Sequence, residues 1–200
     1  MNLRGPKGKI ARALGIPLSP KTAKVLAARP ERPGQHGAAP QRKVSEYKRQ
    51  LMEKQRLRAQ YNLSERQLEN AFAEASRLPG NTGERLLQLL ELRLDAVVLR
   101  SGFARTIFAA RQLVAHGHVT VNGRISKAPG RRLAPGAVVG LRERSKDIVP
   151  VVAALEARPV VPTYLDVQGA ARKSTVRALP VRDQIPVLCE PALVVEFYSR

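Results

Sequence analysis

The chain has 200 residues, a formal net charge of +19 and a sequence pI of about 11.2. Such a charge opposes a compact fold through self-repulsion, so we expect a polyanionic partner: nucleic acid first, an acidic membrane surface a distant second. The longest apolar run, residues 148–155, contains Pro150 and is far shorter than the roughly 20 residues of a membrane-spanning helix. The N-terminus is basic but lacks the apolar core of a signal peptide, so we expect a cytoplasmic protein without a membrane partner.

Basic charge is concentrated in two blocks of the chain. Residues 1–50 carry 12 Lys and Arg against 2 acidic residues, and residues 101–150 carry 9 against 2. The other two segments of fifty residues are nearly neutral. Two separated basic blocks suggest two contact surfaces on one large polyanion.

Metal-binding and redox chemistry have few candidate residues in this chain. The single cysteine, Cys189, excludes an internal disulfide and a zinc site made of several cysteines, and we expect it to be a small buried apolar residue. His36, His116 and His118 have no Cys or carboxylate partners at metal-ligand spacing. We therefore expect neither a metal nor another cofactor.

The N-terminal arm, residues 1–41, is rich in proline. Its six prolines exclude a long helix, and we expect extended, partly disordered backbone that becomes ordered against a partner. Within the arm, Pro33-Gly34-Gln35-His36-Gly37 has two interpretations that the residues leave open. It is an ordinary surface turn, or a tight backbone that lies against RNA with Gln35 and His36 as donors.

Helical periodicity begins near Ser45. One side of the first predicted helix is apolar, and the rest carries basic residues that form either a solvated face or an RNA-facing one: Lys48, Arg49, Lys54, Arg56 and Arg58. Ser64 and Gln67 have capping-box spacing and begin a second helix. Its apolar stripe is predicted to comprise Leu68, Ala71, Phe72, Ala75 and Leu78. Beyond Pro79-Gly80, a third helix is predicted over residues 83–101.

The central stretch, residues 103–124, predicts a basic helix, a glycine joint and a hairpin. Ala109, Ala110, Leu113 and Val114 recur at helical spacing on one face, whereas Arg105, Gln112 and His116 lie on another. Gly117 is expected to end the helix. Val119 and Val121 alternate with polar residues as in a strand, and Asn122-Gly123 is the preferred pair for a two-residue hairpin turn.

Beyond the hairpin, the predicted elements are short. We expect strands over residues 137–141, 164–167 and 174–178, a helix over 151–157, and a helix over 190–198 that begins with Pro191. Mixed helices and antiparallel strands give an α+β fold class.

Four segments in this order resemble one protein family: PGQHG in a basic arm, KQRLRAQY (residues 54–61), GNTGERLLQLLELRLDAVVLRSGFAR, and ARQLVAHGHVTVNGR. The chain resembles the fourth protein of the bacterial small ribosomal subunit over nearly its whole length. It resembles the zinc-free form, because its arm has no cysteine.

The resemblance implies an organisation in three parts. Residues 1–41 would be the basic arm, residues 42–90 with 179–200 a helical domain, and residues 91–178 an inserted RNA-binding module of antiparallel strands and helices. It also implies a structural, non-enzymatic function: primary binding to small-subunit ribosomal RNA, nucleation of subunit assembly, and a share in translational accuracy. The implied partners are that RNA, other small-subunit proteins, especially the fifth, and messenger RNA near its entry path.

An enzymatic alternative remains open, since pseudouridine synthases carry the same RNA-binding module. Arg93-Leu94-Asp95 matches a short motif in which those enzymes place their nucleophilic Asp. Here the triplet lies in a leucine-rich helix, so we expect Asp95 to form an ion pair or a cap. The predicted RNA-binding residues come from both basic blocks: Gln35, His36, Arg42, Lys43, Lys54, Arg56, Arg58, Arg105, Arg111, Gln112, His116, Asn122, Arg124 and Lys127.

Overall fold

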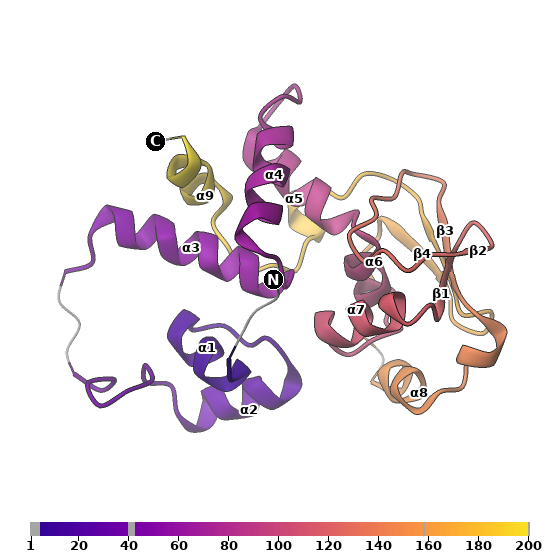
Figure 1. Cartoon of the computed structure of the whole chain (residues 1–200), viewed down its shortest axis with the longest axis horizontal. Helices are drawn as coiled ribbons and strands as arrows, with labels where there is room; N and C mark the ends of the chain where they lie inside the picture. The colour runs from indigo at the N-terminus through magenta and orange to yellow at the C-terminus, as the bar shows by residue number, and fades with distance from the viewer. Residues whose placement is uncertain (1–4, 40–42, 158, 200) are drawn as a thin grey trace. The chain divides into compact units, whose positions relative to one another are not determined.

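The structure is a computed structural model that describes residues 5–39, 43–157 and 159–199. The chain divides into two compact units (Figure 1). Residues 1–86 with 187–200 form the first, here called the helical unit, and residues 87–186 form the second, the sheet unit. The two boundaries differ by four and eight residues from those that the resemblance implies, and the arm is grouped with the helical unit. The described residues form nine α-helices and a five-stranded antiparallel sheet, which confirms the α+β class.

The helical unit contains α1 (Lys7–Leu14), α2 (Pro20–Ala28), α3 (Glu46–Gln60), α4 (Glu65–Ala75), the start of α5 (Thr82–Glu91) and α9 (Pro191–Tyr198). The C-terminal α9 returns to pack along α3 and also contacts α4. The predicted capping box is confirmed, because Ser64 accepts from the backbone N–H of Gln67 and the Gln67 side chain accepts from that of Ser64. Leu78 lies beyond the end of α4 and is exposed, so the predicted stripe is one residue too long.

The arm differs from the extended backbone expected for it, because residues 7–14 and 20–28 are helical. Pro20 occupies the first helical position, where its missing N–H is not needed, and Ser19 and Thr22 cap the helix reciprocally. Around these helices the arm buries Ala11, Leu14, Ile16 and Leu18. The prolines therefore delimit two short helices, which the prediction did not anticipate.

The sheet unit contains α6 (Leu94–Arg100), α7 (Ile107–Ala115), α8 (Val149–Glu156) and the whole sheet. Its strands are β1 (Val119–Val121), β2 (Arg124–Ile125), β3 (Val138–Leu141), β4 (Leu165–Gln168) and β5 (Lys173–Val176), in the order β2-β1-β3-β5-β4. Neighbouring strands are antiparallel throughout. Figure 1 shows α6 and α7 together on one side of the sheet. The core lies between these helices and the sheet, where Phe103, Val114, Val119, Val139 and Val176 are fully buried.

The helix predicted over residues 83–101 is broken, and this prediction is wrong at its middle. α5 ends at Glu91 and α6 begins at Leu94, because the intervening backbone pairs with a distant segment. Leu94 donates its N–H to the carbonyl of Arg131 (2.8 Å), and Leu92 accepts from Leu133 (2.8 Å). Arg93 forms an isolated antiparallel bridge with Arg132. These bonds hold the segment over residues 129–133, here called the basic loop, against the start of α6.

The predicted hairpin is confirmed. Asn122 and Gly123 have positive φ values of 51° and 78°, and they connect β1 to β2 with Val121 opposite Arg124. Both central positions of this turn require positive φ, which Asn and Gly tolerate best. Among the described residues, no helix has the length and apolar character needed to cross a bilayer.

Candidate nucleic-acid interface

Helix α7 presents one apolar and one polar face, as its sequence spacing predicts. Thr106 caps the helix by accepting from the N–H of Ala109 (3.1 Å). Ala110, Leu113 and Val114 are buried, whereas Gln112 and His116 are exposed. Arg105 precedes the helix and is exposed. The helix therefore displays polar groups on the side turned away from the core.

The hairpin lies beside the end of α7 and carries exposed polar residues, with two cations at and just after its second strand. Asn122, Arg124 and Lys127 are exposed. Gly117 packs closely against the segment after the hairpin, since a Cβ placed on it would lie 3.2 Å from Cε of Lys127. Gln112, His116, Asn122, Arg124 and Lys127 are here called the sheet-unit basic face.

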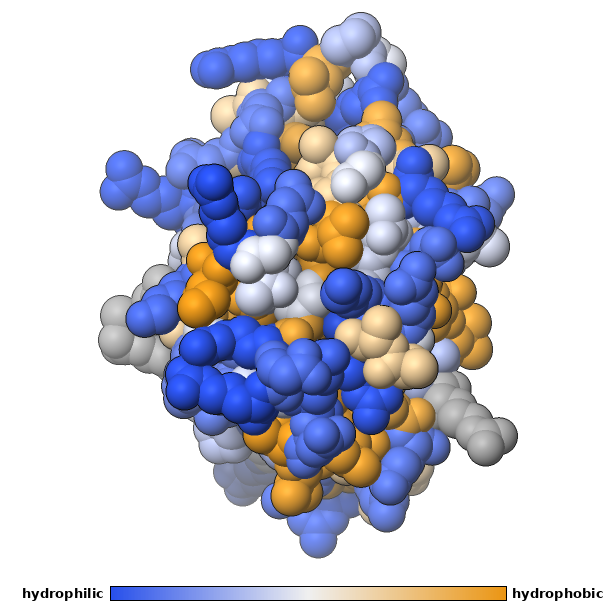
Figure 2. All heavy atoms as spheres, turned by 90° about the vertical axis from the view of Figure 1, so that its right-hand side faces the viewer, coloured by the Kyte–Doolittle hydropathy of each residue, from blue (hydrophilic) through white to orange (hydrophobic). Residues whose placement is uncertain are grey.

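Neither Arg124 nor Lys127, nor Arg105 before the start of α7, takes part in an ion pair among the described residues. Asn122 uses its side-chain oxygen within the fold, because it accepts from the N–H of Val138 (2.8 Å). Figure 2 views the molecule from the right-hand side of Figure 1 and shows hydrophilic side chains around smaller apolar patches.

Arg111 differs from its neighbours because it turns inward. Its Nη1 lies 3.3 Å from Oδ2 of Asp95, and only 18% of its side chain is exposed. Burial lowers the pKa of the Arg111 guanidinium, Asp95 opposes that shift, and Arg93 adds to it. Arg111 therefore contributes to the internal charge balance of the sheet unit, and we do not count it in the basic face.

Asp95 is fully buried and holds two arginines. Arg93 donates to it twice, from Nε to Oδ1 (3.0 Å) and from Nη2 to Oδ2 (2.8 Å). The N–H of Ala96 donates to the same Oδ1 (3.1 Å). The predicted ion pair is therefore present, and a carboxylate enclosed in this way is not placed to attack a substrate.

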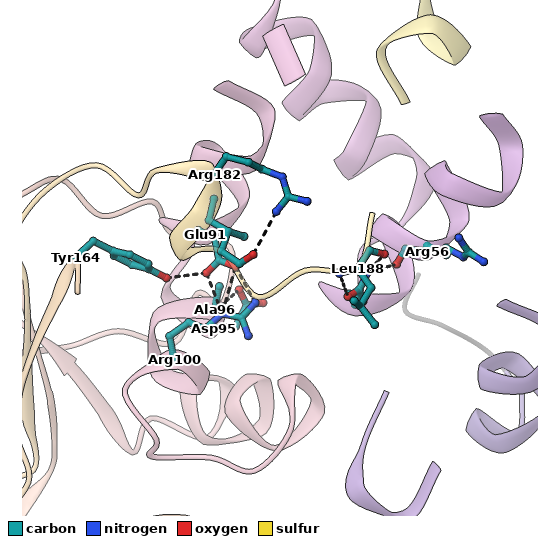
Figure 3. A network of polar contacts seen from close by, with 10 residues as sticks. Arg56, Glu91, Asp95, Ala96, Arg100, Tyr164, Arg182 and Leu188 are labelled. Carbon is teal, nitrogen blue, oxygen red and sulfur yellow. Dashed lines mark hydrogen bonds and ion pairs between the residues drawn. The ribbon is translucent and has the colours of Figure 1, made fainter. Parts of the chain in front are cut away.

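A second buried carboxylate, Glu91, lies in the same unit. Arg100 donates to it (Nη2 to Oε1, 2.7 Å), and so does the hydroxyl of Tyr164 (2.9 Å). Figure 3 shows Arg100 and Tyr164 converging on Glu91 near Asp95. Burial, followed by the charge of Glu91, raises the pKa of the Tyr164 hydroxyl well above its ordinary value. Both networks lie within the sheet unit and are structural.

Three predicted RNA-binding residues of the helical unit form ion pairs within the fold. Lys54 has only 7% of its side chain exposed, its Nζ lies 2.6 Å from Glu65 Oε1, and it sits 4.3 Å from the ring centroid of Phe197. Arg58 pairs with the same carboxylate (2.9 Å). Arg56 donates to the carbonyl of Leu14 (2.9 Å) and pairs with Glu53.

Glu65 is the centre of this cluster. It also accepts from the hydroxyl of Tyr198 on α9 (2.9 Å). Burial raises the pKa of Glu65, but hydrogen bonds from Lys54, Arg58 and Tyr198 outweigh it and hold that pKa below its ordinary value. The cluster fastens α9 to α3 and α4. The aromatic partners of Lys54 lie more than 140 positions away in the sequence, so helical periodicity gave no signal of its burial.

The remaining predicted residues of the helical unit lie at the surface. Gln35, His36 and Lys43 are exposed, whereas Arg42 lies outside the described residues. Exposed cations that the prediction left out include Lys9, Lys21 and Lys24 in the arm and Arg131 in the basic loop. The sequence indicates these cations only through the basic composition of the two blocks, because they belong to none of the quoted motifs.

Cys189 and the histidines give no metal site. Cys189 is half-buried and not fully buried as expected, and its Sγ lies 3.7 Å from the carbonyl oxygen of Glu53. His118 shares a hydrogen bond with the hydroxyl of Ser145 (3.0 Å). Within the described ranges, no group of three or more His, Cys, Asp or Glu side chains is placed to hold a metal ion.

Comparison with known proteins identifies the family. Residues 2–91 match the Ribosomal protein S4/S9 N-terminal domain, and residues 92–139 match the S4 domain. Small ribosomal subunit protein uS4 of Pseudarthrobacter chlorophenolicus is 50% identical over 199 residues, which cover 97% of this chain and 96% of the relative. The uS4 proteins of Geobacillus sp. and Streptomyces griseus are 47% and 48% identical, over 98% and 100% of this chain and 98% and 99% of theirs. Two domain matches in the expected order and identity near one half along the whole chain show that it belongs to the small ribosomal subunit protein uS4 family.

Proposed function

We propose that this structural protein of the small ribosomal subunit binds ribosomal RNA through two basic surfaces, one on each compact unit. The first is the sheet-unit basic face. The second is formed by the exposed cations of the arm together with Gln35, His36 and Lys43. Membership of the family establishes the ribosomal role and leaves the enzymatic alternative without support.

The observation that carries this proposal is the separation of cations into two kinds. Buried cations are matched by carboxylates within the fold: Lys54 pairs with the partly exposed Glu65, and Arg93 pairs with the fully buried Asp95. Arg124 and Lys127 are exposed and belong to none of the ion pairs of the described chain. Phosphates of RNA supply the missing negative charge and release counterions when they bind.

We further propose that the protein binds early in subunit assembly and acts in the cytoplasm. Early binding is supported by the high net charge, because electrostatic attraction to RNA is long-ranged and speeds association. Contact with the fifth protein of the small subunit, and through it a share in translational accuracy, follows from the family resemblance. By the family resemblance, Arg42 and Lys43 match positions near the messenger entry path, and Lys43 is exposed.

A pair of double variants tests the sheet-unit basic face. Arg124→Ala with Lys127→Ala removes two exposed cations from the face. Lys146→Ala with Arg177→Ala removes the same charge from the same unit, but from residues that already pair with Glu143 and Asp166. Affinity for small-subunit ribosomal RNA fragments is measured over a range of salt concentrations.

We expect the face variant to make the plot of log affinity against log salt shallower by about 1.4–1.8, the value for two lost phosphate contacts. The control is expected to keep the original slope. Equal slopes for both variants would show that the face does not contact phosphates.

A further inference from the structure

The arm contains one arginine that bonds to a whole run of backbone. Arg12, on α1, donates from Nε to the carbonyls of Arg29 (3.1 Å) and Glu31 (2.9 Å), and from Nη2 to that of Arg32 (3.2 Å). These three carbonyls follow the end of α2. A single guanidinium therefore connects α1 to the irregular segment that leads away from α2.

Helix α1 is itself anchored. Ala11 and Leu14 are buried, and Arg56 of α3 donates to the carbonyl of Leu14 (2.9 Å). Arg12 thus extends from an element that is fixed to the rest of the helical unit. Its hydrogen bonds transmit that fixed position to residues 29–32.

The next residues, Pro33 to Gly37, form the PGQHG turn, which lies in close contact with the carbonyl of Arg32. A Cβ placed on Gly37 would lie 1.9 Å from the carbonyl oxygen of Arg32, which is the oxygen that Arg12 holds. Gly37 also donates its N–H to the carbonyl of Gly34 (3.1 Å), which closes the turn. Only glycine allows this approach, so the position of the turn depends on the position of the Arg32 carbonyl.

We propose that Arg12 is a positioning residue that sets the PGQHG turn in its RNA-binding geometry before RNA arrives. This proposal rests on the proposed function, in which Gln35 and His36 of that turn contact RNA. Arg12 acts through the backbone and not by touching RNA. A turn held in advance loses less conformational entropy on binding, which increases affinity without an added contact.

The chemistry requires arginine at this position. The planar guanidinium offers several donors in a fixed fork, whereas a lysine ammonium is a single point of charge on a flexible stem. Arg12→Lys therefore keeps the charge and removes the fork. Arg29→Ala is the matched control, because it removes a positive charge from the same segment while its backbone carbonyl stays available to Arg12.

The first experiment is amide hydrogen exchange on the free, full-length protein. In Arg12→Lys we expect exchange over residues 34–39 to accelerate at least about tenfold, since hydrogen bonds to a charged donor are among the stronger ones. The amides of Gly37 and Ala39 report on the turn directly, because both donate within it. Arg29→Ala should exchange like the parent, and unchanged exchange in Arg12→Lys overturns the proposal.

The second experiment joins the turn to RNA binding through a double-mutant cycle. His36→Ala should weaken RNA affinity in the parent, and should have at least about threefold less effect in the Arg12→Lys background because the turn is already misplaced. Additive losses overturn the positioning role. If His36→Ala has no effect in the parent, the proposed RNA contact fails, while the exchange data still decide whether Arg12 holds the turn.

Discussion

Cations that look alike in the sequence differ in the structure in how deeply they are buried and in whether they form ion pairs. Lys54 and Lys127 both lie in stretches that match the family, yet Lys54 is enclosed by Glu65 and Phe197 whereas Lys127 is exposed beside Gly117. A buried cation without a carboxylate is strongly unfavourable, so each inward-facing one requires a partner. Surface cations such as Lys127 are solvated and do not require a carboxylate partner.

The buried carboxylate of Asp95 is expected to be a major determinant of stability. Asp95→Asn leaves Arg93 and Arg111 without their shared counter-charge, and loss of one member of a buried pair costs about 3–5 kcal/mol. Urea unfolding measures the effect. Asp166→Asn, which disrupts the exposed pair with Arg177, should cost less than about 1 kcal/mol. Similar losses for the two variants would contradict the role assigned to Asp95.

Glu65 gives the helical unit a defined dependence on acid. Its folded-state pKa lies below the unfolded value, so its contribution is complete above the unfolded pKa and is lost as pH falls through the folded pKa. Glu65→Gln should therefore lower stability at neutral pH and flatten the decline below about pH 5, near the unfolded pKa of a glutamate. Urea midpoints between pH 3 and 7 provide the measurement. The control is Glu46→Gln, which removes the carboxylate of the exposed Arg49–Glu46 pair and should follow the stability curve of the parent. If Glu65→Gln also followed the parent curve, the cluster would make no contribution to stability.

At the level of elements, local chemistry was readable from the sequence. The Ser64–Gln67 capping box, the Asn122-Gly123 turn and the apolar face of α7 each depend on residues within a few positions of one another. Their physical cause is therefore contained in a short stretch of chain. The predicted exposure of Gln112 and His116 follows from the same local periodicity.

Features set by distant contacts were not readable. The break between α5 and α6 depends on the basic loop, nearly forty positions away, which supplies hydrogen bonds that replace those of a continuous helix. The inward turn of Arg111 depends on Asp95 in the same way. In the arm, the spacing of the prolines predicts extended backbone, although Pro20 begins a helix. Pairing across the fold decided the first two outcomes, whereas the helix start at Pro20 depends on the local caps from Ser19 and Thr22.

Helix α7 offers a direct separation of stability from binding. Leu113→Ala removes a buried side chain and should cost about 2–5 kcal/mol of stability. Arg105→Ala should leave the thermal melt unchanged and weaken RNA binding, since Arg105 is exposed. Arg111→Ala should reduce stability as well, because it takes a partner from Asp95. Melts and RNA affinities of the three variants are compared per folded molecule. A destabilised Arg105→Ala with full affinity would make Arg105 structural.

For the whole molecule, salt dependence is the expected signature of binding. A net charge of +19 with two exposed basic surfaces should make log affinity for ribosomal RNA fall linearly with log salt, by about 0.7–0.9 per neutralised phosphate. Six contacts would correspond to a slope of about −4 to −5. The test is to titrate the RNA with the protein at salt concentrations between about 50 and 400 mM. A slope near zero would exclude an electrostatic interface.

The return of α9 to α3 sets an order of events during synthesis. Every residue of the sheet unit, 87–186, is synthesised before residues 191–198 of α9. Domains fold as units while the chain is still growing, so the sheet unit can mature first. The helical unit must wait, with Lys54 and Glu65 still lacking Phe197 and Tyr198. A chain whose translation stops a few codons early would thus carry a finished sheet unit beside an open helical one, a difference by which proteases can distinguish complete from incomplete copies.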